Sequence, residues 1–166
     1  NEPVITLYKL LLLFQKEKRN YIKNNIHKYI KKICPIIDDN YIKNKLINNK
    51  LIFYTFNTQI TKYSLYNEIC GCLLYRIILQ TKYKKRIYIS LIGINPKISG
   101  NGYGSIFLDE FIQKYKCNNQ ILELVLLSLP ESKNFYISLG FTQNSSIYIE
   151  KNEDIGDNII LTKIIF

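Results

Sequence analysis

The sequence has 166 residues, of which 47% are hydrophobic and 22% are charged, and its formal net charge is +10. These values fit one compact domain with a sizeable core and exclude a chain that is disordered throughout. We therefore expect a single domain over residues 1–166. Lys, Asn, Ile and Tyr are frequent in every part of the chain, loops included, so the charge indicates a general composition and not a specific nucleic-acid site. Because the sequence begins at Asn1 and contains no methionine, we expect it to be incomplete.

The cysteines and the single histidine predict no metal site. Structural zinc requires four ligands in paired spacings. These residues lack such spacings: Cys34, Cys70, Cys72, Cys117 and His27. We expect all four cysteines to be small buried residues in a reducing compartment, which would be cytoplasmic, with a nuclear location as a further option. The apolar run at residues 10–14 is too short to cross a bilayer, so no membrane partner is expected.

The first third of the chain predicts one short strand and two helices. Residues 4–8 fit a strand, and residues 10–33 carry apolar side chains at roughly helical spacing until Pro35 stops the pattern. Asp38 and the aspartate after it are typical of a helix start, and this second helix should run to about Asn49.

A sheet and one crossover helix follow. Three segments are rich in Ile, Leu, Tyr and Phe and predict an antiparallel meander: residues 51–56, 69–79 and 85–94. Residues 57–67 between the first two should form a long hairpin loop. After Gly104, apolar residues recur on one helical face and predict a helix. Residues 121–127 then predict a strand that is buried on both faces and pairs parallel with its neighbour. A short helix at residues 131–139, ended by Gly140, and a hairpin of residues 142–149 and 159–166 should close the fold.

A glycine-rich segment, Ser99-Gly100-Asn101-Gly102-Tyr103-Gly104, lies between a predicted strand and a predicted helix. Backbone N–H groups and the positive end of the helix can hold a phosphate there, and glycine allows the backbone to approach it closely. The spacing excludes a nucleotide P-loop, which ends in Gly-Lys-Ser/Thr, and the Gly-x-Gly-x-x-Gly of a dinucleotide fold. The segment predicts a pyrophosphate loop, with a plain turn as the alternative.

A second segment, Asn134-Phe135-Tyr136-Ile137-Ser138-Leu139-Gly140-Phe141, follows one strand later. In this order and spacing, the two segments resemble the Arg/Gln-x-x-Gly-x-Gly and Phe-Tyr-x-x-x-Gly-Phe motifs of the GNAT superfamily of N-acetyltransferases. The resemblance covers the chain from about Leu51 onward. Ser99 stands where the family has Arg or Gln, so one phosphate contact from a long side chain is missing.

The resemblance implies an α/β (α+β mixed) GNAT fold, with a mixed sheet of six to seven strands that is splayed at the acetyl-CoA site and flanked by about four helices. It implies an acyltransferase that uses acetyl-CoA as cosubstrate and no metal. Tyr136 would protonate the leaving CoA thiolate, since a phenol of pKa about 10 can share a proton with it; the alternative is a packed aromatic. The residues that would bind CoA lie on one strand and on the glycine loop: Ile92, Ile94, Ser99, Gly100, Asn101, Gly102, Tyr103, Gly104 and Ser105.

Three shorter segments resemble protein N-terminal acetyltransferases that act on methionine-starting chains. They correspond to an Arg-Leu-Tyr-Ile-Met-Thr-Leu-Gly strand, a Phe-Pro-Val loop and a Tyr-Tyr pair in those enzymes: residues 85–93, 33–36 and 147–148. This resemblance implies that Cys34, Pro35 and Ile36 line the pocket for the first side chain. Tyr88 would help to remove the proton from the amine, and Tyr148 would bind the peptide. The alternative is ordinary core packing.

The histidine of those enzymes falls at Leu124, so proton removal is left to Tyr88 or water. Strand alternation should point the adjacent Glu123 to the opposite face, in a structural role. An α-amine has a pKa of about 7.7–8, against about 10.4 for lysine, so part of it is already neutral at cellular pH. We therefore expect a protein or peptide N-terminus as acceptor, with an auxiliary subunit or the ribosome as further partners. A small-molecule acetyltransferase, for example for an amino sugar phosphate, and a non-catalytic acyl-CoA-binding subunit remain as alternatives.

Overall fold

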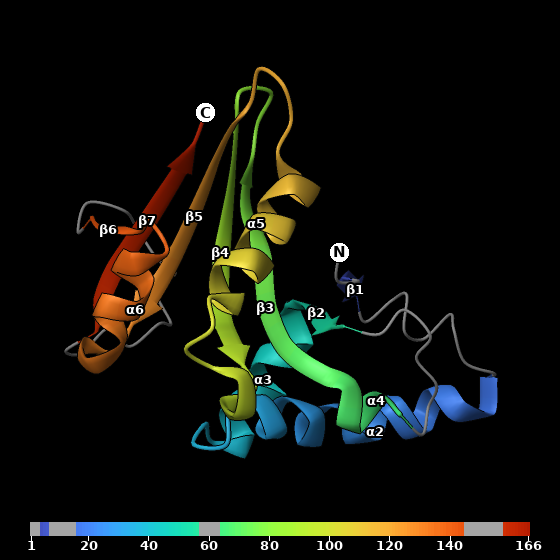
Figure 1. Ribbon diagram of the computed structural model, residues 1–166. Coiled ribbons are helices and arrows are strands. Elements are labelled where there is room, and N and C mark those ends of the chain that lie inside the picture. Colours follow the sequence, from blue (N-terminus) through green and yellow to red (C-terminus); the bar gives the residue numbers. More distant parts are fainter. Residues whose placement is uncertain (1–3, 7–15, 57–63, 145–157) are drawn as a thin grey trace. The chain divides into compact units, whose positions relative to one another are not determined.

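The computed structural model describes residues 4–6, 16–56, 64–144 and 158–166. The strands of these residues form one hydrogen-bonded sheet in the order β1-β2-β3-β4-β5-β7-β6 (Figure 1). β1, β2 and β3 pair antiparallel, β4 and β5 pair parallel, and β7 pairs antiparallel with both β5 and β6. The strands are β1 (Val4–Thr6), β2 (Lys50–Thr55), β3 (Ile69–Gln80), β4 (Lys84–Ile94), β5 (Ile121–Ser128), β6 (Thr142–Gln143) and β7 (Ile159–Ile165). This mixed sheet confirms the expected α/β class.

Five α-helices are formed by the described residues, one more than expected: α2 (Lys16–Ile33), α3 (Asp39–Asn48), α4 (Leu65–Glu68), α5 (Tyr103–Tyr115) and α6 (Lys133–Ser138). The additional helix, α4, is a single turn that begins within the stretch expected to be a loop, residues 57–67, and ends one residue after it. Its side chain Leu65 is fully buried, and a turn this short carries no periodicity that could reveal it. In the described part of the chain, no helix is long and apolar enough to cross a membrane.

The chain divides into two compact units, one of Asn1–Tyr75 with Leu91–Glu110 and one of Arg76–Ser90 with Phe111–Phe166. Strands β3 and β4 and helix α5 each contribute residues to both units.

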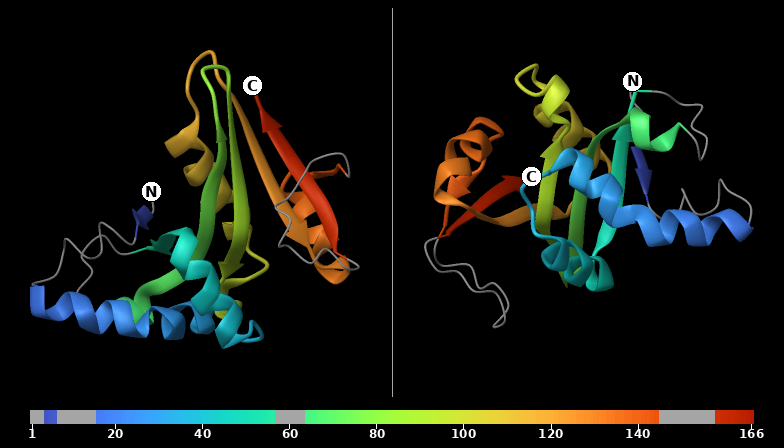
Figure 2. Two further views of the ribbon diagram at one scale, coloured as in Figure 1. Left: turned by 180° about the vertical axis from the view of Figure 1, so that it is seen from behind. Right: turned by 90° about the horizontal axis from the view of Figure 1, so that it is seen from below.

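In the first unit, helices α2 and α3 cover one face of the β2–β3 pair (Figure 2). Ile30 and Ile33 of α2 and Ile42 of α3 join Phe53 and Leu74 of the strands in one apolar cluster. Burying such side chains stabilises the fold by about 1.5–3 kcal/mol each. Asp38 begins α3 as predicted, because its carboxylate accepts a hydrogen bond of 3.3 Å from the backbone N–H of Tyr41.

The opposite face of the same strand pair packs on the first part of α5. The Tyr54 ring stacks on Phe107 at 4.3 Å between centroids, and its hydroxyl donates a hydrogen bond of 2.9 Å to the Phe107 carbonyl. Burial raises the pKa of Tyr54 well above its ordinary value. Gly71 is required beside this ring, because a Cβ there would lie 2.6 Å from Phe107 Cε2. Burial on both faces explains the uninterrupted apolar sequence of β2.

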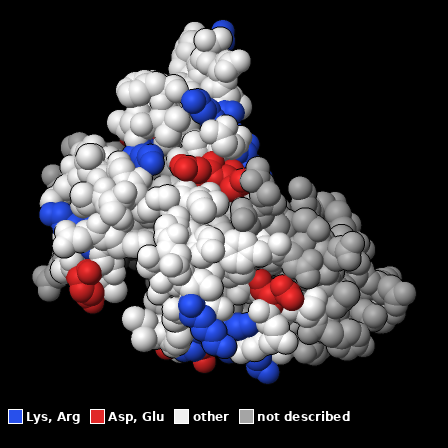
Figure 3. All heavy atoms as spheres, viewed as in Figure 1, with Lys and Arg blue, Asp and Glu red and all other residues white. Residues whose placement is uncertain are grey.

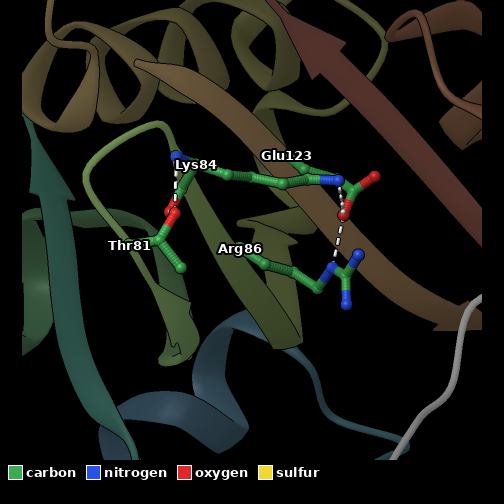
Figure 4. Close-up of polar contacts among 4 residues, drawn as sticks. All are labelled: Thr81, Lys84, Arg86 and Glu123. Carbon is green, nitrogen blue, oxygen red and sulfur yellow. Dashed lines mark hydrogen bonds and ion pairs between the residues drawn. The ribbon is translucent and has the colours of Figure 1, made fainter.

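In the second unit, β5 lies between β4 and β7, and its residues from Leu122 to Leu126 are buried. Glu123 is the charged exception, with 3% of its surface exposed. In the parallel register it lies opposite Arg86, which donates to it from Nε, and the Lys84 ammonium lies 3.6 Å away (Figure 4). A buried carboxylate is tolerated only when it is paired in this way.

The cysteines do not all behave as predicted. Cys72 is buried, Cys34 and Cys70 are half-buried, and Cys117 is exposed, so the expectation of four buried thiols is wrong. Cys117 lies in the turn after α5, where the chain has left the apolar face of the helix. Cys70 lies at an irregularity in the β2–β3 register, where Tyr54 pairs with Gly71 but Thr55 pairs with Ile69.

Candidate active site

The glycine loop has the open backbone that a phosphate site requires. Gly100 and Gly102 have φ angles of 83° and 79°, and nothing lies within 4 Å of a Cβ built on either. Glycine adopts this left-handed conformation at no steric cost, whereas most residues with a Cβ are strained in it. Two side chains brace the loop against the preceding turn: Asn101 Nδ2 donates to the Ile98 carbonyl at 3.0 Å, and Ser99 Oγ donates to the Pro96 carbonyl at 3.1 Å.

Helix α5 begins directly after Gly102, and its first N–H groups have no partner within the helix. Tyr103 anchors this first turn, since its ring contacts Phe56 at 4.9 Å between centroids. Gly104 is buried, whereas Ser99 and Ser105 are exposed. A solvent-facing row of backbone donors at an anchored helix start is the arrangement expected for binding the pyrophosphate of CoA.

The second half of β4 carries the next predicted contacts. Its parallel pairing with β5 ends at Ile89 and Leu126, although β4 itself continues to Ile94. Ile92 and Ile94 therefore lie beyond the last residue pair of this ladder. Their backbone groups are the ones expected to bind the pantetheine arm.

The loop predicted to receive the first side chain of the acceptor is here called the acceptor loop and consists of Cys34, Pro35 and Ile36. It lies against the same part of β4. Cys34 follows α2 directly, and its N–H donates a hydrogen bond of 2.8 Å to the Ile30 carbonyl. Its sulfur packs against Gly93 so closely that a Cβ on residue 93 would overlap it. Pro35 is exposed, and Ile36 is 91% exposed, an unusual position for a large apolar side chain. The structure thus places Cys34 against Gly93. Gly93 is the residue of β4 between Ile92 and Ile94, the two residues predicted to bind the pantetheine arm.

Tyr136 lies in the last turn of α6, and the segment from Tyr136 to Phe141 forms the C-terminal cap of this helix. The N–H of Phe141 donates to the Tyr136 carbonyl at 3.1 Å, and the N–H of Gly140 donates to the Ile137 carbonyl at 3.0 Å. With Gly140 at φ 93° and the rings of Tyr136 and Phe141 6.0 Å apart, this is a complete Schellman motif. Lys163 Nζ donates to the Leu139 carbonyl at 2.7 Å and further closes this helix end. The Tyr136 side chain is half-buried.

Tyr88 is buried in the second unit, in a cluster with Val125. The guanidinium of Arg76 lies over its ring, 4.7 Å from the centroid, where the ring quadrupole attracts a cation. The sequence interpretation missed Arg76. Its signal was present, since Arg76 is the one charged residue within the apolar strand β3.

The predicted residues fall into two groups. The glycine loop, Ile92, Ile94 and the acceptor loop belong to the first unit, and Tyr88 and Tyr136 belong to the second. Tyr148 lies outside the described residues.

A hollow of about 510 Å³ lies elsewhere in the first unit, and none of its lining residues was predicted for the site: His27, Lys28, Lys31, Lys32, Asp39 and Tyr66. Lys31 pairs with Asp39 at 3.4 Å, and Lys32 donates to the Tyr66 carbonyl. Burial, followed by the nearby Lys97, lowers the pKa of Lys32. On the face of the molecule in Figure 3, the basic side chains form several separate groups with acidic groups among them. This distribution agrees with the expectation that the positive charge reflects the overall composition of the chain.

Comparison with known proteins agrees with the geometry of the glycine loop and the mixed sheet. Residues 30–141 match the acetyltransferase (GNAT) family. No curated protein sequence matches the chain significantly.

Solved structures share the fold at low sequence identity. Tetrahymena GCN5 is 11% identical with a TM-score of 0.62, over 100% of this chain and 96% of its own. A GNAT family acetyltransferase from Elizabethkingia anophelis with acetyl-CoA bound is 21% identical with a TM-score of 0.53, over 82% and 88%. Arabidopsis thaliana Naa50, in complex with the bisubstrate analogue CoA-Ac-MVNAL, is 19% identical with a TM-score of 0.50, over 96% and 97%.

The family match covers well over half of the chain and includes the glycine loop, the crossover helix and the Tyr136 segment. It confirms the expectations of a GNAT fold and of acetyl-CoA as the cosubstrate. The chain belongs to the GNAT acetyltransferase family and is an acyltransferase that uses acetyl-CoA.

Proposed function

We propose that this acetyltransferase acts on the α-amino group of protein or peptide N-termini. The contact of Cys34 with Gly93 is the observation that carries the proposal. It joins the loop expected to receive the first side chain of the acceptor to the strand expected to hold the acetyl end of CoA. The exposed Ile36 on that loop offers an apolar surface to such a side chain. In Naa50, the related fold binds an analogue that links CoA to a peptide beginning with methionine.

The surroundings of β5 favour an acceptor that needs little help to lose its proton. Leu124 is fully buried, and the neighbouring carboxylate of Glu123 is engaged by Arg86 and Lys84. A carboxylate held by two cations is a poor general base. An α-amine, with its pKa of about 7.7–8, is better suited to such a site than a lysine, whose pKa is about 10.4.

In the proposed reaction, the neutral amine attacks the carbonyl carbon of the acetyl thioester. The carbon–sulfur bond breaks, and the CoA thiolate takes a proton from the Tyr136 hydroxyl. The amine loses one proton to water, with the Tyr88 hydroxyl as a hydrogen-bonding relay, and the Tyr136 phenolate regains a proton from water. The products are the acetylated N-terminus and free CoA. The glycine loop holds the pyrophosphate during these steps.

A peptide panel tests the acceptor. We expect release of CoA thiol with peptides beginning Met-Leu or Met-Ile, and little release with acetyl-capped peptides that contain lysine or with amino sugar phosphates. Ile36→Ser should lower kcat/KM for the Met-Leu peptide about tenfold, because an apolar contact worth about 1.4 kcal/mol is lost. Since Ile36 is exposed, the substitution should not affect folding.

Ile47→Ser is the matched control, because Ile47 is also an isoleucine of the first unit, is 76% exposed and lies in α3. It should leave kcat/KM unchanged. Rapid acetylation of internal lysines with no turnover of Met-starting peptides would refute the proposed acceptor, and preferred turnover of amino sugar phosphates would favour the small-molecule alternative. CoA binding without turnover of any amine would favour a binding subunit.

A further inference from the structure

Two cysteines that are far apart in the sequence meet under the acceptor loop. Cys72 of β3 is fully buried in the apolar cluster of the first unit, and Cys34 packs against that cluster from the end of α2. A hydrogen bond between the two thiols is the largest cause of the pKa shift of each. Both residues belong to segments whose backbones are held, Cys34 by its bond to Ile30 and Cys72 by its pairing with Phe53.

The two thiols have different chemical characters. The hydrogen bond from the Cys72 thiol lowers the pKa of Cys34, whereas the same bond and complete burial raise the pKa of Cys72 well above its ordinary value. The thiolate is the form that reacts with oxidants, and Cys34 is the half-buried member that a small oxidant can reach. Cys72 is shielded from solvent but adjacent to any product formed on Cys34.

The thiols of the other two cysteines donate to backbone carbonyl groups. Cys70 donates its thiol to the Glu68 carbonyl at 3.4 Å, and Cys117 donates to the Tyr115 carbonyl at 3.7 Å. Each of these sulfurs bonds to the backbone of its own segment. They therefore serve as internal controls for general thiol oxidation.

We propose that Cys34 and Cys72 form a reversible disulfide on exposure to hydrogen peroxide, and that this bond switches the acceptor loop. The Cys34 thiolate attacks one peroxide oxygen, the O–O bond breaks, and a sulfenic acid forms with release of hydroxide. The Cys72 sulfur then attacks the Cys34 sulfur, the S–O bond breaks, and the proton of Cys72 leaves with the oxygen as water. In sum, two thiols are oxidised and one peroxide is reduced to two waters.

The effect on the acceptor loop follows from packing and rests on the proposed function. A disulfide holds its sulfurs about 2.0 Å apart, far closer than hydrogen-bonded thiols. Cys34 would be drawn toward β3 and away from Gly93, which it now contacts without room to spare. Pro35 and Ile36 follow it in the chain, so the surface offered to the first side chain of the acceptor changes.

The covalent step is tested directly on the purified full chain. After reduction and removal of the reductant, a few equivalents of hydrogen peroxide should remove two of the four thiols counted by a thiol reagent in denaturant. Proteolysis and mass spectrometry should find the Cys34 peptide linked to the Cys72 peptide, and dithiothreitol should restore all four thiols. Cys70→Ser and Cys117→Ser should still form this link, and Cys34→Ser should not.

Peptide mapping in the unmodified chain does not depend on the folding of any variant. Four intact thiols, a link between other cysteines, or Cys34 advancing to sulfinic acid would each overturn the proposal.

A second measurement tests the switch. The oxidised chain should have a kcat/KM for the Met-Leu peptide at least about tenfold lower than the reduced chain, because small displacements in an active site have large effects on rate. The dissociation constant for acetyl-CoA should not change. A mapped disulfide with unchanged kcat/KM would overturn the switch. If the reduced chain fails to acetylate any N-terminus, the proposed function is lost, and the mapped disulfide alone decides the redox chemistry.

Discussion

Tyr136 has a structural role and a proposed catalytic role, and the two can be separated at its hydroxyl group. Its carbonyl accepts the N–H of Phe141, and its ring packs against the Phe141 ring across the end of α6. These contacts need an aromatic residue but no hydroxyl. The proposed proton transfer needs the hydroxyl and nothing else from the side chain.

Tyr136→Phe should therefore keep the fold and lose the chemistry. We expect kcat to fall about 100-fold or more, the usual range for loss of a general acid, with an unchanged KM for acetyl-CoA. Steady-state release of CoA thiol measures both values. Tyr115→Phe, in another half-buried tyrosine of the same unit, should show no such loss. Near-normal kcat in Tyr136→Phe would leave Tyr136 only its structural role.

The start of α5 has the backbone geometry expected of an anion-binding site. Gly100 and Gly102 turn the chain through left-handed conformations, and the helix that follows aligns its first N–H groups and its dipole. The absence of a long side chain at Ser99 matters less for this reason. The free energy of phosphate binding is expected to depend chiefly on backbone geometry.

Gly102→Ala tests this dependence. A side chain in the left-handed region costs roughly 1–2 kcal/mol, so the loop should relax and the donors should lose their alignment. We expect the dissociation constant for acetyl-CoA, measured by isothermal titration calorimetry, to rise about tenfold, which corresponds to about 1.4 kcal/mol.

Asn119→Ala introduces comparable backbone strain at φ 63°, but in the turn before β5. It should reduce stability to a similar extent and leave acetyl-CoA affinity unchanged. Equal affinity losses in the two variants would mean that the glycine loop has no special part in binding.

On the scale of the whole molecule, binding of acetyl-CoA should raise the free energy of unfolding. A ligand that binds only the folded chain stabilises it by about 2.7 kcal/mol at a concentration 100 times its dissociation constant. For a chain of this length, acetyl-CoA should then raise Tm by roughly 5–10 °C. Differential scanning fluorimetry measures the shift, with adenosine as a control that lacks both pyrophosphate and pantetheine. The shift should be smaller for Gly102→Ala, and no shift at saturating acetyl-CoA would contradict the assigned cosubstrate.

Features with a local cause were predictable from the sequence. Asp38 starts α3 and Gly140 ends α6 because each makes its hydrogen bond or its turn within a few residues of chain. The almost continuously apolar sequence of β5 indicated burial on both faces, and the burial of its residues from Leu122 to Leu126 confirms that interpretation. The order of loop, helix, strand and Tyr136 segment was sufficient to predict the family.

Other features depend on residues that meet only after folding. The turn α4 forms where Leu65 is buried, Arg76 meets the Tyr88 ring across two strands, and Cys34 reaches Cys72 through the packing of α2 on β3. Arg76 is conspicuous as the one charged residue of an apolar strand, but no periodicity or motif in the sequence specifies its partner or the other two contacts. The sequence by itself determined the longer helices, the main strands and the acetyl-CoA chemistry, since their causes act within a short segment. The tertiary structure alone decided which thiols touch and that Cys34 faces Gly93, because packing joins residues that the chain keeps tens of positions apart.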